Sequence, residues 1–151
     1  MNLGRSYNAY NKEGSRREKP MKRTNSETIK PDIQIGISIY NQPQHWVEKC
    51  VYSALNQEGD YSIICTIRVD GQKGCDESTK HWLLELSRNK PELKIIFGEE
   101  NTGTYGSYKE IFKQSDSKYL CQLDADDWLN KKAIKKCIDL GIGFGTILAA
   151  Q

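Results

Sequence analysis

The sequence of 151 residues lacks several features that define whole classes of protein. No run approaches about 18 consecutive apolar residues, the length that a membrane-spanning helix needs, and the N-terminus lacks the apolar middle section of a secretion signal. Neither GxGxxG, a dinucleotide-binding fingerprint, nor GxxxxGK, a triphosphate-binding loop, occurs. We therefore expect a cytoplasmic chain with one domain, large enough to bury a core, that uses neither of these phosphate-binding loops.

The sequence also lacks any CxxC pair, although it contains five cysteines. An odd number without metal-ligand spacing argues against both a zinc site and a disulfide framework. Cys50, Cys65 and Cys121 fall on faces that the pattern predicts to be buried. His45 and His81 have no partner at ligand spacing, so we expect both on the surface. The cysteines are predicted to be free thiols.

Positive charge is concentrated in the first 31 residues, which hold eight Lys or Arg and three acids although the net charge of the whole chain is only +2. This segment is too poor in apolar residues to offset the entropy of ordering it, so we predict a disordered basic tail over 1–31 and a folded domain over 32–151. A solvated linker is favoured, with weak contact to anionic lipid at the inner face of the membrane as the alternative. Its densest run of charges, 12–23, contains no aromatic residue to stack on bases, so no nucleic-acid partner is expected.

From Asp32 onward, strand-like and helix-like patterns alternate. Isoleucines alternate with polar or small residues over 33–39, and apolar residues then recur every three or four positions over 47–55. Further strand-like runs cover 62–71, 93–97 and 119–123, and helix-like patterns cover about 77–88 and 105–112. Repeats of this kind predict an α/β fold with a mostly parallel sheet and right-handed crossovers.

Polar residues lie at the end of every predicted strand. In order along the chain these residues are Ser38 and Tyr40, then Asp70, then Asn101 and Gly103, then Asp124, Asp126 and Asp127. In open parallel sheets ligands bind at the carboxyl ends of the strands, so all four sets should face one edge. The three aspartates after the last strand repel one another, which leads us to expect a cation beside them.

The succession IGISIYNQ, CVYSALNQ, IRVDGQ, ENTGTYGSY and YLCQLDADDWL resembles the nucleotide-sugar-binding half of the family 2 glycosyltransferases. The resemblance runs from about Asp32 to Leu140 and depends on the whole order, because a lone DxD is weak. It implies the Rossmann-like A-type glycosyltransferase fold, which we expect to be incomplete at the C-terminus. It also implies a metal-dependent enzyme of the kind used in polysaccharide biosynthesis. Such an enzyme transfers sugar from a nucleotide sugar, a UDP-sugar being favoured, to a hydroxyl of a glycan or other acceptor.

The resemblance gives the aspartate cluster a specific role. Asp126 matches the metal-binding carboxylate of the family's DxD, Asp124 matches the one toward the ribose and diphosphate, and Asp127 is a supporting ligand. Mn²⁺ or Mg²⁺ is implied, and both are hard cations that prefer oxygen ligands and can bridge to the diphosphate. The alternative is a helix N-cap for a helix starting near Lys131, which explains one aspartate but not three.

The remaining strand-end residues match nucleotide contacts in the family. Asp70 corresponds to an acid that hydrogen-bonds the base, although Val69 and Gln72 depart from the usual two acids followed by Gly and Ser, which leaves the nucleotide open. An Asp-Gly turn is the structural alternative for Asp70. Ser38 and Tyr40 correspond to nucleoside contacts, with Tyr40 either stacking on the base or covering the sheet edge. Asn101 and Gly103 correspond to an Asn-x-Gly element near the nucleotide, which a plain turn explains nearly as well.

A general base for the acceptor hydroxyl is not found in the sequence, because Asp139 is the only acid after the DADD cluster. The segment from Gly141 to Gln151 could be one more strand or a frayed terminus. We therefore expect a donor-binding half, truncated or part of a larger protein, that binds donor weakly and does not transfer sugar alone. Two alternatives remain open. One is a binding-only nucleotide-sugar module, and the other is a nucleotidyltransferase, against which the loop YNQPQHW argues because it has neither Gly nor Lys or Arg.

Overall fold

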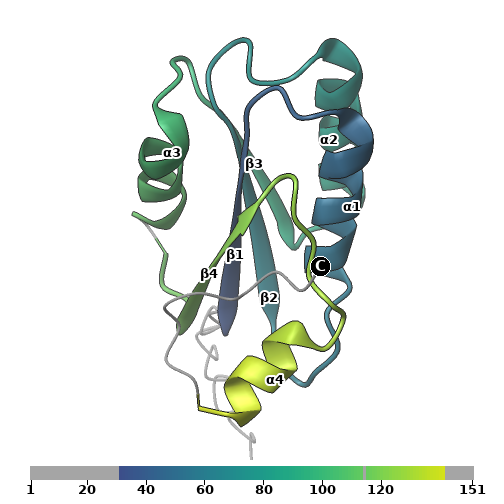
Figure 1. Cartoon of the computed structure of the whole chain (residues 1–151), viewed down its shortest axis with the longest axis vertical. Coiled ribbons are helices and arrows are strands. Elements are labelled where there is room, and N and C mark those ends of the chain that lie inside the picture. The colour runs from purple at the N-terminus through teal and green to yellow at the C-terminus, as the bar shows by residue number, and fades with distance from the viewer. Residues whose placement is uncertain (1–30, 114, 142–151) are drawn as a thin grey trace, which may run out of the picture.

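The computed structural model describes residues 31–113 and 115–141, and Figure 1 shows their arrangement. Apart from Pro31, the predicted tail over 1–31 lies outside the described residues, as does the segment 142–151. Strands and helices alternate in chain order: β1 (Ile33–Ile39), α1 (Gln44–Leu55), β2 (Ile63–Val69), α2 (Glu77–Asn89), β3 (Leu93–Phe97), α3 (Gly103–Phe112), β4 (Tyr119–Asp124) and α4 (Ala133–Asp139).

The described strands form one parallel sheet in the order β3-β2-β1-β4. The central strand β1 pairs with β2 from Ile33 opposite Ile63 and with β4 from Ile33 opposite Tyr119. β3 extends the sheet beyond β2, with Leu93 opposite Cys65. The predicted α/β architecture with a parallel sheet of βα repeats is therefore confirmed.

The core lies between the sheet and the helices α1 and α2, which cover one face, whereas α3 lies on the other face (Figure 1). The four isoleucines of β1 point into this core and are fully buried, as are Val47, Cys50, Val51 and Ala54 of α1. Their spacing of two in the strand and three or four in the helix explains why these segments adopt these elements. The isoleucine alternation therefore sets which face of β1 meets α1.

The opposite face of the sheet is polar and closely packed by α3. Gln34 of β1 is buried and donates through Nε2 to Thr66 Oγ1 at 2.9 Å and to the Ile111 carbonyl at 3.2 Å. Gly36 lies directly under Phe112, since a Cβ at Gly36 would stand 2.7 Å from Phe112 Cζ. The missing side chain lets α3 approach the sheet closely.

The loops at the carboxyl edge of the sheet have defined chemistry. Asn41, after β1, has φ +61°, a left-handed conformation that Asn tolerates, and its N–H donates to the Gly74 carbonyl at 2.7 Å. Gly71 has φ +87°, and a Cβ there would stand 2.8 Å from the backbone nitrogen of Asn101. Asp76 caps α2 by accepting from the Thr79 N–H at 2.7 Å. These loops hold the ends of β1, β2 and β3 together.

Two helix predictions differ from the structure. α3 begins at Gly103, and Tyr105, the first residue of the helix-like pattern predicted over 105–112, is 84% exposed because it lies on the outer side of the first turn. α4 begins at Ala133 instead of near Lys131. The expectation for the cysteines is confirmed, since Cys50, Cys65 and Cys121 are buried and none of the described cysteines forms a disulfide. His45 and His81 are exposed, as expected.

Within the described part of the chain, no helix combines the length and the apolar character needed to cross a lipid bilayer.

Candidate functional site

A cavity of about 390 Å³ opens at the carboxyl edge of the sheet. It is lined by Ser38, Tyr40, Gln42, Asp70, Asn101, Gly103, Thr104, Asp124 and Asp126. The sequence had placed seven of these residues at strand ends, and the structure brings those seven together. Asp127, which the sequence grouped with them, is not part of the lining.

The position of the cavity follows from the strand order. The chain adds β2 and β3 on one side of β1 and then crosses to add β4 on the other side. Ser38 at the end of β1 is paired in register with Asp124 of β4, so the two sides of the reversal meet at the cavity. Ligand sites in open α/β sheets form at this kind of reversal.

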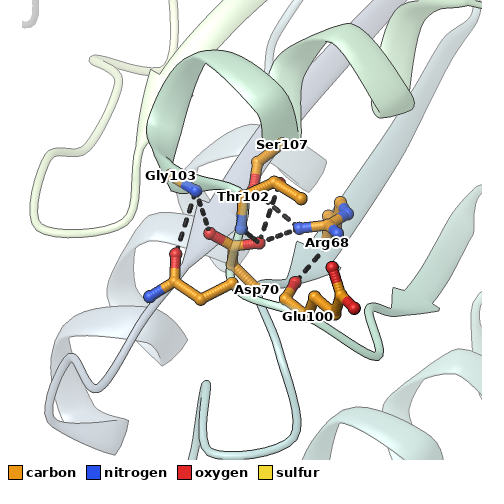
Figure 2. Close-up of polar contacts among 7 residues, drawn as sticks. Arg68, Asp70, Glu100, Thr102, Gly103 and Ser107 are labelled. Carbon is orange, nitrogen blue, oxygen red and sulfur yellow. Dashed lines mark hydrogen bonds and ion pairs between the residues drawn. The ribbon is translucent and has the colours of Figure 1, made fainter.

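Asp70 forms the centre of a hydrogen-bond cluster on one side of the cavity (Figure 2). Its Oδ1 accepts from the Thr102 N–H at 2.9 Å and from Thr102 Oγ1 at 3.1 Å, and its Oδ2 accepts from the Gly103 N–H at 2.8 Å. The Asn101 side chain also accepts from the Gly103 N–H at 2.9 Å. Asp70 therefore fastens the start of α3 to the end of β2, although α3 has no acid in its own first turn.

Arg68 supplies the counter-charge for Asp70. Its Nη1 donates to Asp70 Oδ1 and to Ser107 Oγ, the latter at 2.9 Å. Burial opposes ionisation of Asp70, but donation from Thr102 and Arg68 outweighs it and holds the pKa of the Asp70 carboxyl below its ordinary value. Asp70 is thus an ionised, internally paired carboxylate, and the Asp-Gly turn alone does not account for its side chain.

Asp124 lies on the opposite side of the cavity and is also held by α3. The Tyr108 hydroxyl lies 2.9 Å from Asp124 Oδ1 and 2.9 Å from the Leu123 carbonyl oxygen, and its single proton is shared between these two acceptors. Burial, with the Asp124 carboxylate adding to it, raises the pKa of the Tyr108 phenol above its ordinary value. Tyr108 therefore remains a neutral donor that fixes one oxygen of Asp124.

The segment after Asp126 is fixed by α1. The Lys49 ammonium stands 3.1 Å from the centre of the Trp128 ring, and Ser53 Oγ accepts from the Leu129 N–H at 2.9 Å. α4 begins only at Ala133, with Lys132 at its N-cap, so the aspartates do not cap this helix. The helix-cap explanation of the aspartate cluster is therefore wrong.

The described residues form no group of three or more His, Cys, Asp or Glu side chains that could hold a metal ion by themselves. Asp124 and Asp126 nevertheless line one cavity and supply hard oxygen donors. Mg²⁺ typically takes one or two protein carboxylates and completes its shell with water and substrate phosphates. Two carboxylates therefore fit a cation that arrives with a diphosphate and do not fit a permanent structural metal.

Several residues of the site were not predicted from the sequence. Gln42 and Thr104 line the cavity, and Thr102, Ser107 and Tyr108 support its acids. Arg68 did carry a signal, because it is the one charged residue in β2, which is otherwise apolar except for Thr66. The hydroxyl groups on α3 carried none, since Ser and Tyr are common on exposed helix faces.

Comparison with known proteins identifies relatives. Residues 34–140 match Glycosyl transferase family 2. The chain is 31% identical over 116 residues to chondroitin synthase of Escherichia coli, a match that covers 76% of this chain and 16% of that protein. The chain thus spans about a sixth of the length of this relative.

Solved structures share the fold. The mannosyltransferase PcManGT from Pyrobaculum calidifontis, solved with GDP-Man and Mn²⁺, superposes with a TM-score of 0.62 at 14% identity, covering 78% of this chain and 34% of that one. S. aureus TarS 1-349, solved with UDP-GlcNAc, gives a TM-score of 0.57 at 20% identity over 72% and 30% of the two chains. The sheet and its βα repeats therefore have the A-type glycosyltransferase fold. Since the family match covers most of its length, the chain belongs to glycosyl transferase family 2.

Proposed function

We propose that the cavity binds a nucleoside diphosphate sugar together with Mn²⁺ or Mg²⁺ and is the donor site of a glycosyltransferase. The observation that carries the proposal is the meeting of Asp70, Asn101, Asp124 and Asp126 at one strand edge in a chain of this family. Two solved structures with this fold hold GDP-Man with Mn²⁺ and UDP-GlcNAc. A site with these acids and the same fold supports the same class of ligand.

The charge of the cavity supports a bound cation. Its described lining contains three aspartates and no Lys, Arg or His. Arg68 balances Asp70 from behind the wall, which leaves Asp124 and Asp126 without a described cationic partner. A diphosphate cannot approach two carboxylates unless a positive charge lies between them, and a divalent cation supplies that charge. When bound, the cation also acts as a Lewis acid for the departing nucleotide.

The proposed contacts divide the cavity into two ends. Asp126 is the metal ligand, Asp124 binds the metal and the ribose-diphosphate side, and Asp127 supports the cluster from outside the lining. At the nucleoside end, Ser38, Tyr40, Asp70, Asn101 and Gly103 contact base and ribose. Asp70 Oδ2 accepts one described bond, from Gly103, and so keeps acceptor capacity for the imide N–H of uracil.

The acceptor in this proposal is a glycan or another hydroxyl compound, and the donor is a UDP-sugar. Transfer needs a base to remove the acceptor proton. Asp139 does not line the cavity and pairs with Lys135 at 2.6 Å, so it is not assigned this role. Among the described residues we assign this role to none, and we expect this chain alone to bind donor without transferring sugar.

Titration calorimetry with UDP in the presence and absence of Mn²⁺ tests the donor site. The wild-type chain should bind UDP more tightly with the metal, and Asp126→Ala should abolish this gain. Asp127→Ala should reduce it only partly, because Asp127 lies outside the lining.

Asp60→Ala is the matched control. Asp60 is exposed and precedes β2, so it lies at the opposite edge of the sheet from the cavity. Equal UDP affinity with and without metal, or identical behaviour of the Asp126 and Asp60 variants, would contradict the metal-dependent donor site. Robust acceptor glycosylation by the 151-residue chain would show that the base lies within it.

A further inference from the structure

A buried arginine stands behind the nucleoside end of the cavity. Arg68 lies in β2 between the buried apolar residues Ile67 and Val69 and is only 5% exposed. Arginine is almost never buried to this extent without a partner, because its charge is costly to remove from water. The role of Arg68 must therefore be sought in what its guanidinium contacts.

The guanidinium contacts three separate parts of the chain (Figure 2). Nη1 donates to Asp70 and to Ser107 Oγ, and Nη2 reaches the Glu100 carbonyl at 3.4 Å. The group lies against Gly98, where a Cβ would stand 2.5 Å from Arg68 Nη2 and 2.8 Å from its Cζ. Arg68 thus links the end of β2 to both sides of the loop between β3 and α3.

That loop carries one wall of the cavity. Asn101, Gly103 and Thr104 line the cavity and lie between Glu100 and Ser107, the two loop and helix residues that Arg68 contacts. Asp70 holds the same stretch through the backbone N–H groups of Thr102 and Gly103. The wall is therefore tied down at both of its ends by one ion pair.

Arg68 also determines which carboxylates of the cavity lack a counter-charge. Without a counter-ion, Asp70 would be a third unbalanced acid beside Asp124 and Asp126. Pairing with Arg68 commits Asp70 to holding the wall and leaves the other two as the negative end of the cavity. The two ends then differ in charge, as a nucleotide with a neutral base and an anionic diphosphate bound to a cation requires.

From this geometry we infer that Arg68 is a positioning residue for the nucleoside end of the donor site: it fixes Asp70 against the start of α3 and so sets the wall formed by Asn101, Gly103 and Thr104. The inference rests on the proposed donor function. Arg68 itself does not touch the nucleotide. It acts on base and ribose binding and leaves the metal and diphosphate end unaffected.

Two ligands distinguish binding at the nucleoside end of the cavity from binding at the metal and diphosphate end. UDP uses both, whereas pyrophosphate with Mg²⁺ uses only the metal and diphosphate end. Arg68→Met should weaken UDP binding by about tenfold, comparable to the loss of one charge-assisted hydrogen bond, and should change pyrophosphate affinity less than about twofold. Asp126→Ala should weaken both ligands. The matched control is Arg88→Met, which removes an exposed arginine of α2 and should leave both affinities unchanged.

Removing a buried charge can unfold a domain, so we add a second variant that keeps both Arg68 and Asp70. Gly98→Ala places a methyl group where the guanidinium lies, and the flexible end of Arg68 can move away without disturbing the strands. It should weaken UDP binding selectively, as Arg68→Met does. In both variants, amide hydrogen exchange over 101–107 should become faster while exchange in β1 stays slow.

Each outcome of these binding and exchange measurements either supports or contradicts the positioning role of Arg68. Selective loss of UDP binding with faster exchange over 101–107 supports the positioning role. Equal loss of UDP and pyrophosphate would mean that Arg68 only stabilises the domain, and unchanged UDP affinity in folded Arg68→Met and Gly98→Ala would also overturn the inference. A wild-type chain that binds neither ligand would overturn the donor site itself, and this role with it.

Discussion

Tyr108 provides a direct test of how α3 supports the acids of the cavity. Tyr108→Phe removes one hydroxyl, whose single proton is shared between the Leu123 carbonyl and Asp124 Oδ1, both at 2.9 Å, and leaves the ring in place. Tyr108 is 6% exposed and its ring stacks on Phe112 with 6.1 Å between centroids, so packing should persist. The variant therefore isolates the hydrogen bonds.

The expected loss follows from the nature of the acceptor. A hydrogen bond to a charged group contributes about 1.5–3 kcal/mol, and we take the lower end because Asp124 itself is exposed to water, which replaces the lost donor. A loss of about 1.5 kcal/mol should lower the urea midpoint by about 1 M for a typical dependence on urea of about 1.5 kcal/mol per M. The slope of the transition should not change.

Tyr105→Phe is the matched control, because Tyr105 lies on the same helix and is 84% exposed. In urea unfolding followed by circular dichroism, the midpoint of Tyr105→Phe should equal the wild-type value. Metal-dependent UDP binding should weaken about threefold in Tyr108→Phe, since Asp124 loses the donor that orients it, and should not change in Tyr105→Phe. Equal midpoints for the two variants would refute the claim that the Tyr108 hydroxyl holds β4.

Three further predictions concern packing, acid stability and thiols. Gly36→Ala should destabilise the domain by about 1–3 kcal/mol in urea unfolding, and Phe112→Leu should recover part of that loss, because the new methyl group would meet the Phe112 ring at 2.7 Å. Asp70 has a lowered pKa in the folded state, so its contribution is complete above about pH 4, the ordinary value for Asp, and is lost as pH falls through the folded pKa. Asp70→Asn should flatten this part of the acid unfolding curve, and an unchanged curve would contradict the pairing. Burial raises the pKa of Cys121 to about 12. A disulfide reagent should therefore react in the folded chain only with the half-buried Cys75 and Cys137, and with the buried Cys50, Cys65 and Cys121 only after unfolding.

The sheet could be predicted because its pattern is local. The isoleucines of β1 alternate at period two, and Val47, Cys50, Val51 and Ala54 recur at helical spacing, so strand and helix follow from neighbouring residues alone. The gathering of Asp70, Asn101, Asp124 and Asp126 could also be predicted, because parallel strands share one carboxyl edge.

The supporting contacts could not be predicted, because they depend on how α3 sits on the sheet. Arg68 and Ser107 are far apart in sequence, and the hydrogen bond between them exists only because the second turn of α3 passes over the end of β2. Tyr105 and Tyr108 look alike in a helical pattern, yet one is exposed and the other bonds Asp124. The helical spacing of apolar residues predicts which face of a helix is buried, but it does not predict which part of that face another element covers.

The strand order also has a consequence for the time course of folding. β4 reaches its place beside β1 only after the chain has passed through β2 and β3, so the pairing of Ile33 with Tyr119 closes the longest loop in the sheet. Long loops close slowly and at an entropic cost, which favours early docking of β2 and late docking of β4. On the ribosome, the contacts of Arg68 and Asp70 with α3 can form as soon as α3 has emerged, whereas Asp124 and Asp126 emerge only with β4, the last strand that the structure describes. A growing chain therefore gains the two aspartates of the proposed metal end only after β1, β2 and β3 have emerged, so the proposed donor site cannot form before β4 is in place.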